Sequence, residues 1–94
     1  MEPNAAPTPY RSTPVFDETT LPAALRREHR TKPGVWGVVR MLEGQLRLSF
    51  LDPPQTQILS VDSPGLLLPD QAHFVLPIGS MRMQVDFYDQ PPRL

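Results

Sequence analysis

The sequence predicts a single, small, all-β domain built as an antiparallel sandwich or barrel, and three observations predict it. The chain has 94 residues, which leaves room for one hydrophobic core only. Its 13 prolines exclude long helices, because proline is not tolerated in helix interiors. Several short apolar runs are separated by Gly, Pro and Asp turn signals with no helical interludes, which is typical of sandwiches and barrels rather than βαβ folds.

The first elements are an extended arm and a short helix. Residues 1–12 are rich in proline and small polar residues and show no periodic apolar face, which predicts a Pro-rich N-terminal arm ahead of one domain at 13–94. A short helix is expected to follow, with Thr20 as its N-cap and Pro22 in its first turn, ending near Arg27.

Strands account for the rest of the chain. Apolar runs and alternation predict strands at residues 35–42, 46–50, 57–61, 66–68, 73–76 and 81–88. Glu43-Gly44 is expected to form a tight turn between the first two strands, and Asp52-Pro53-Pro54-Gln55 a second reversal. In the last strand Met81, Met83, Val85 and Phe87 alternate with polar residues, so one row of side chains faces the core.

Composition argues against several classes of partner and cofactor. The formal net charge is −1, so no nucleic-acid partner is expected, and a short basic run is interpreted as a solvated edge: Arg26, Arg27, Arg30 and Lys32. The absence of cysteine excludes disulfides and thiolate zinc sites and fits a reducing compartment. No apolar stretch approaches the length of a membrane span and no leader precedes the domain, which favours a cytoplasmic protein without a membrane partner.

The two histidines, His29 and His73, are the candidates for chemistry. Imidazole is a common ligand of transition metals, and residues far apart in sequence can meet if their strands line one barrel mouth, with Glu28 or Asp86 completing the ligand shell. The alternative is that each histidine is a separate hydrogen-bonded turn residue, because a metal site normally has three protein ligands and no His-x-His pair is present. Asp86 lies on the row opposite Val85, and its alternative role is an outward, solvated carboxylate.

The candidate ligand pocket comprises Trp36, Lys32 and Tyr88. The amphipathic rings of Trp36 and Tyr88 could flank a ligand, although a lone tryptophan in a small domain is also typical of a core. No Ser-His-Asp spacing and no Gly-rich phosphate loop is present, so hydrolase chemistry and a nucleotide cofactor lack support. Whether Arg40, Arg47 and Arg82 point into a cavity depends on the strand register.

Five segments carry a resemblance to a known family: Leu21-Pro22-Ala23-Ala24-Leu25, His29-x-Thr31-Lys32-x-Gly34-x-Trp36-Gly37, Leu42-Glu43-Gly44-Gln45-Leu46, Pro69-x-x-x-His73 and Val85-Asp86-Phe87-Tyr88. Taken in order, they resemble the TehB/YeaR-like cupin domain, over about Thr13 to Tyr88. That family occurs alone or fused ahead of the methyltransferase of some tellurite-resistance TehB proteins. No methyltransferase is present in this sequence, so methyl transfer is not implied.

The resemblance implies a double-stranded β-helix, or jelly-roll, barrel. It implies that His29 and His73 correspond to the histidines of the two cupin motifs and point into one cavity. There they would hold a divalent transition metal such as zinc, iron, manganese or nickel. Asp86 is our candidate for a third, carboxylate ligand from the sequence itself. The usual cupin pattern has a His-x-His pair and a following Glu, whereas this chain has Thr31, Pro33 and Gly37 at the corresponding positions.

Three functions follow as hypotheses. The first is a binding domain that holds a small polar or anionic ligand, with or without a divalent ion, as part of a response to tellurite or another stress. The second is a metal-dependent cupin enzyme of the oxygenase or isomerase type, using His29, His73 and Asp86. The third is a structural dimerisation module. A homodimer is expected in all three, because so small a core supplies only a few kcal/mol of stability.

Overall fold

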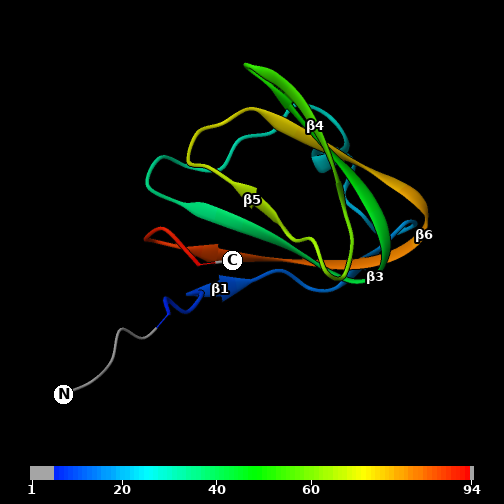
Figure 1. Ribbon diagram of the computed structural model, residues 1–94, viewed down its shortest axis with the longest axis horizontal. Coiled ribbons are helices and arrows are strands. Elements are labelled where there is room, and N and C mark those ends of the chain that lie inside the picture. The colour runs from blue at the N-terminus through cyan, green and yellow to red at the C-terminus, as the bar shows by residue number, and fades with distance from the viewer. Residues whose placement is uncertain (1–5, 94) are drawn as a thin grey trace.

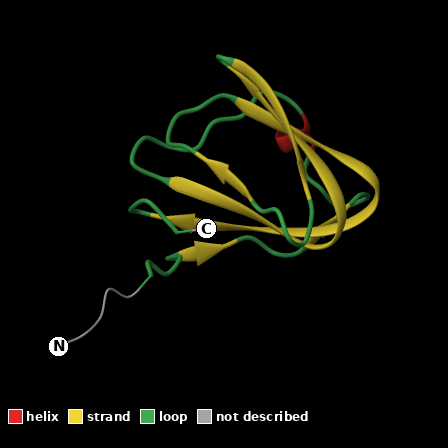
Figure 2. Ribbon diagram, viewed as in Figure 1, coloured by secondary structure: helices red, strands yellow, loops and turns green. Residues whose placement is uncertain are grey.

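The structure is a computed structural model that describes residues 6–93, and it confirms the all-β prediction. The elements in chain order are β1 (Arg11–Ser12), β2 (Phe16–Asp17), the 3₁₀ helix η1 (Ala23–Arg26), β3 (Trp36–Leu51), β4 (Pro54–Leu59), β5 (Gly65–Leu67) and β6 (His73–Tyr88). All strand pairs are antiparallel, in the order β1-β6-β3-β4, with β2 also on β6 and β5 also on β3 (Figures 1 and 2). Within residues 6–93, β4 and β5 are not hydrogen-bonded to each other, so the sheet is not closed.

The two long strands, β3 and β6, bend so that the sheet doubles over on itself (Figure 1). Each strand has 16 residues. The first half of β3, Trp36–Met41, pairs with the second half of β6 and with β5. The second half of β3, Gln45–Phe50, pairs with the first half of β6 and with β4. The halves therefore form two layers that belong to one continuous sheet.

The expected tight turn at Glu43-Gly44 is wrong, because Gly44 bends a continuous strand. The register of β3 against β6 shifts on both sides of Glu43, which marks a bulge. Gly44 has a φ of +74°, and an added Cβ would lie 2.3 Å from the backbone oxygen of Ser80. A glycine with positive φ fits a hairpin and a bulge equally well, and the pairing with β6 on both sides decides for the bulge.

The segments predicted at 73–76 and 81–88 are likewise one strand, β6. Gly79, with a φ of +66°, lies within the register shift of β6, and Pro77 is paired with Leu46 just before that shift. The edge strand β4 begins at Pro54, three residues before the expected start, since proline is compatible with the first residue of a strand.

The core lies between the two layers. Its buried members come from both halves of the bent strands and from the elements beside them: Leu21, Val39, Met41, Leu46, Leu48, Leu59, Leu67, Val75, Met81, Met83 and Val85. Gly65 in β5 allows the layers to approach, because a Cβ there would lie only 2.8 Å from the side chain of Leu59 in β4.

The N-terminal part of the chain is more tightly bound to the sheet than the sequence suggested. Arg11 and Ser12, assigned to the arm, form β1 against Phe87 and Asp86, while residues 1–5 of that arm lie outside the described residues. The helix expected to begin at Thr20 is reduced to η1, which has no side-chain cap. None of the helical structure in residues 6–93 is long and apolar enough to span a membrane.

Candidate functional site

The two histidines lie next to each other. His29 and His73 exchange both backbone hydrogen bonds, with N···O distances of 2.8 and 2.9 Å, and so form an antiparallel bridge. Residues paired in this way project their side chains to the same side of the sheet. Their ring centroids are 5.7 Å apart with the planes at 81°, and both rings line one cavity.

His73 is held as a neutral imidazole with one nitrogen free to accept a hydrogen bond. The residue is only 2% exposed, and Nδ1 lies 2.9 Å from the carbonyl oxygen of Gln71. Because a carbonyl can only accept, Nδ1 carries the proton and Nε2 is the acceptor. Burial lowers the pKa of His73, the bond to Gln71 raises it and the charge of His29 lowers it, and the net direction is downward.

Asp86 lies on the outer face of the sheet. Its carboxylate accepts a hydrogen bond of 2.7 Å from the Ser12 hydroxyl and forms a 3.1 Å ion pair with Nε of Arg40. Burial raises the pKa of Asp86. The hydrogen bonds from Arg40 and Ser12 and the charge of Arg40 lower it by more, so the pKa lies below its usual value. Asp86 is therefore a buried, ion-paired carboxylate rather than a solvated one.

The structure thus brings together two of the three predicted metal ligands. Glu28, the other carboxylate considered, lies 3.8 Å from the guanidinium of Arg30. Among residues 6–93, no three His, Cys, Asp or Glu side chains are grouped so that they could hold a metal ion. Alternation over Met81–Tyr88 at the end of β6 puts Asp86 on the face opposite the inward row that contains Val85.

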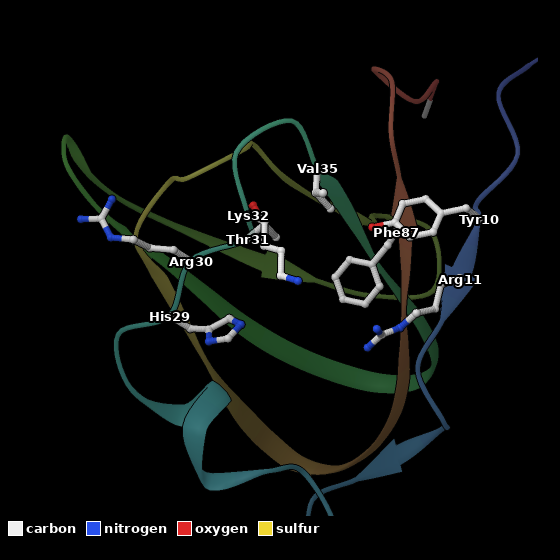
Figure 3. Close-up of a pocket in the computed structure, with 8 residues that line it drawn as sticks. All are labelled: Tyr10, Arg11, His29, Arg30, Thr31, Lys32, Val35 and Phe87. Atoms are coloured by element: carbon white, nitrogen blue, oxygen red, sulfur yellow. The ribbon is translucent and has the colours of Figure 1, made fainter.

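A cavity of about 210 Å³, here named the mouth cavity, opens between the loop after His29 and the paired ends of β1 and β6 (Figure 3). It is lined by Tyr10, Arg11, His29, Arg30, Thr31, Lys32, Val35 and Phe87. A second cavity of about 250 Å³, the inner cavity, shares Arg11, His29, Thr31 and Phe87 with it. The shared residues mean that the two cavities adjoin.

The mouth cavity is positively charged. Its lining, within the described part of the chain, includes Arg11, Arg30 and Lys32 but no carboxylate. Arg30 donates to the backbone oxygen of Asp70 at 2.8 Å, and its head is turned away from the cavity (Figure 3). The heads of Arg11 and Lys32 point towards the cavity centre, and the Arg11 guanidinium carbon lies 5.4 Å from the centroid of the Phe87 ring (Figure 3). This arrangement is suited to binding an anion.

Of the three predicted pocket residues, Lys32 lines the mouth cavity. Trp36 and Tyr88 are directly opposite each other in the register of β3 and β6, and they line neither cavity, whereas their neighbours Val35 and Phe87 line the mouth. Arg40, Arg47 and Arg82 also line neither cavity.

Sequence reasoning missed Arg11, Tyr10 and Phe87 as cavity residues. Arg11 reaches the mouth cavity only because β1 pairs with β6 at the far end of the chain. The alternation in the last strand did place Phe87 on the inward row, so for that residue a signal was present. The basic run is solvated as expected at Arg30 and Lys32, which are both exposed, and Lys32 also turns its head towards the mouth cavity (Figure 3).

Comparisons with known proteins identify a family and solved structures that are similar to this chain. The family model for the TehB-like domain matches residues 11–85. TehB from Haemophilus influenzae has a similar solved structure, with a TM-score of 0.79, 25% sequence identity and coverage of 88% of this chain, which spans 31% of that protein's length. A protein from Escherichia coli strain K12 has a TM-score of 0.82 at 20% identity, with 97% of this chain and 98% of that one covered. No curated protein matches the chain. Since the family match covers most of the sequence, the chain belongs to the TehB-like family.

Proposed function

We propose that this chain is a cupin-type jelly-roll domain that binds a small anion in its mouth cavity. The observation that carries the proposal is the pair of cationic heads, Arg11 and Lys32, that point into a cavity whose lining, within residues 6–93, includes no carboxylate. The net charge of the chain is −1, so this positive site is local and not a consequence of a basic protein. Guanidinium groups suit oxyanions because their donors match two oxygens at once.

The fold part of the proposal is supported by the doubled sheet and by the family match. Two layers that face each other across one core, joined by two long bent strands, are the arrangement expected of a jelly roll. The resemblance to the domain found in tellurite-resistance TehB proteins makes a toxic oxyanion such as tellurite one candidate ligand. We also propose that the protein acts in the cytoplasm.

Calorimetric titration with tellurite, sulfate and phosphate at constant ionic strength tests anion binding. We expect Lys32→Ala and Arg11→Ala each to weaken binding by about tenfold, since a charge-assisted hydrogen bond contributes about 1.5–3 kcal/mol. Arg47→Ala is the matched control, because Arg47 is exposed and lines neither cavity. Equal weakening in the control, or no binding of any of the three anions, would contradict the proposal.

A divalent metal is the second candidate, favoured by the 5.7 Å separation of the His29 and His73 rings. The acceptor Nε2 of His73 suits a metal, but the described residues provide two imidazoles and no third ligand, so they do not fit the usual three-ligand site. This weakens the case for a metal-dependent enzyme.

Metal analysis of protein purified without an affinity tag tests this candidate. A metal site predicts stoichiometric zinc, iron, manganese or nickel that is lost in both His29→Ala and His73→Ala. Asp86→Asn is the control and should retain the metal, because Asp86 is engaged by Arg40 and Ser12. Metal-free wild-type protein would exclude the candidate.

A further inference from the structure

The inner cavity differs in character from the mouth cavity that it adjoins. It is lined by seven apolar side chains from β2, η1, β5, β6 and the turn before η1, namely Phe16, Pro22, Ala24, Leu25, Leu67, Val85 and Phe87. Its remaining lining residues are Thr13 and His73 together with the shared Arg11, His29 and Thr31. Lys32 therefore lines the mouth cavity but not the inner one, whereas Arg11 lies at the boundary between the two cavities.

Some apolar side chains of the inner cavity are not fully buried in the core. Phe16, Leu25 and Phe87 are only partly buried and pack against the core from its edge. Phe87 belongs to both cavities, and its ring lies beside the heads of Arg11 and Lys32 (Figure 3). The hollow thus runs from a cationic opening, past an aromatic ring, into an apolar end.

We infer that the ligand is an organic anion, a small carboxylate with a short apolar or single-ring body. The inference rests on the proposed anion binding and names the class of ligand. The carboxylate would lie against Arg11 and Lys32, and the body would enter the inner cavity along Phe87. An inorganic oxyanion would fill only the mouth, whereas a carboxylate with an apolar body would also remove the inner apolar surface from water.

The polar groups at the boundary agree with this class of ligand. His73 Nε2 is an acceptor at the wall of the inner cavity, so it could take a hydrogen bond from a hydroxyl on the ligand. The inner cavity limits the size of the body, since its volume of about 250 Å³ is below the about 300 Å³ at which drug-sized pockets begin. We therefore expect a body no larger than a single ring or a short chain.

The test compares four probes by calorimetric titration at constant ionic strength: phenylacetate, acetate, sulfate and the neutral phenylacetamide. We expect phenylacetate to bind at least about tenfold more tightly than acetate, because burying a ring in an apolar cavity is favourable. Phenylacetamide should bind much more weakly than phenylacetate, because it lacks the charge that Arg11 and Lys32 recognise.

Leu25→Gln separates the two ends of the hollow, because Leu25 lines the inner cavity only. We expect this variant to lose the preference for phenylacetate while its affinities for acetate and sulfate stay unchanged. Leu68→Gln is the matched control, since Leu68 is 44% exposed and lines neither cavity. As a readout that needs no variant, phenylacetate but not sulfate should shift the backbone amide resonances of Leu67 and Val85.

Each other outcome overturns one part of the argument. If sulfate and acetate bind as tightly as phenylacetate, the organic ligand is wrong and the anion site stands. If phenylacetamide binds as tightly as phenylacetate, the cavity selects apolar bodies without regard to charge, and the inference is wrong. If no anion binds at all, the proposed function itself fails.

Discussion

At the scale of single residues, Asp86 joins three elements on the outer face of the sheet. Its carboxylate, on β6, accepts from Ser12 on β1 and from Arg40 on β3. We expect Asp86→Ala to lower the free energy of unfolding by about 1–3 kcal/mol, because two donors lose their buried acceptor. Urea denaturation measures the change, with the exposed Asp89→Ala as control. A loss no larger than that of the control would contradict this role.

His73 makes the stability of the fold depend on pH near neutrality. Its pKa in the folded protein is lowered, mainly by burial, below the ordinary value of 6.5. As the pH falls below 6.5, the unfolded chain binds a proton at this residue while the folded chain does not, so stability falls until the folded pKa is reached. Asp86 does not interfere, because its contribution is lost only below its ordinary value of 3.8.

His73→Gln removes the titrating group while leaving an amide that can donate to Gln71. We expect the free energy of unfolding of the wild type to decrease between pH 7 and pH 5, and that of the variant to decrease less. Urea titrations at several pH values provide the comparison. Identical pH dependence in the two proteins would show that His73 is not the group responsible.

At the scale of elements, the bend in β3 depends on Gly44. Gly44→Ala places a Cβ 2.3 Å from the Ser80 backbone oxygen and also strains a φ of +74°. Gly34 is a matched control, because its φ is +78° but nothing lies within 4 Å of an added Cβ. We expect Gly34→Ala to cost about 1 kcal/mol and Gly44→Ala at least about 2 kcal/mol more, by urea denaturation. Equal costs would mean that the contact with β6 is not required.

The elements also show how much of the fold the sequence predicts. Alternation along Met81–Tyr88 correctly assigns the row of side chains that faces the core. In a half-buried strand, apolar and polar residues alternate because successive side chains point to opposite faces. The turn expected at Gly44 and the break expected at Pro77 were wrong because these local signals fit a bulge as well, and the choice depends on a partner strand far away in sequence.

The residues of the candidate site also include some that the sequence could predict and some that it could not. His29 and His73 could be selected by residue type, and the structure brings them together. Arg11 could not, because nothing local distinguishes it from other exposed arginines until β1 pairs with β6. Trp36 lines neither cavity, whereas Val35, just before β3, lines the mouth, a difference of one residue that composition and residue type do not resolve.

At the scale of the whole molecule, β6 organises the functional region. Its last residues pair with β1, and its first residue pairs with His29. Because β6 bends, both of its halves pack against the same core. Residues from near both ends of the chain consequently meet at the mouth cavity (Figure 3). The mouth cavity therefore depends on long-range strand pairing rather than on any single local motif.

The outer face of the layer that contains β4 supports the expectation of a homodimer. Ile58 on β4 and Leu76 on β6 both lie opposite Arg47, and their exposed fractions are 44% and 37%. Among the described residues β4 pairs with β3 alone, so its other edge has unpaired backbone groups. A second copy covering this edge and face would satisfy those groups and bury the apolar side chains.

We expect the wild type to have the mass of a dimer by size-exclusion chromatography with light scattering. Ile58→Lys should shift it to a monomer, because it adds a second positive charge beside Arg47 in the row of Ile58, Arg47 and Leu76, where we expect the copies to meet. Val61→Lys is the control: Val61 is 59% exposed but lies in the turn after β4, away from that row. A monomeric wild type would refute the dimer, and dissociation by both variants would place the interface elsewhere. Because a small core supplies only a few kcal/mol, the monomeric variant should also unfold at lower urea concentration than the wild type.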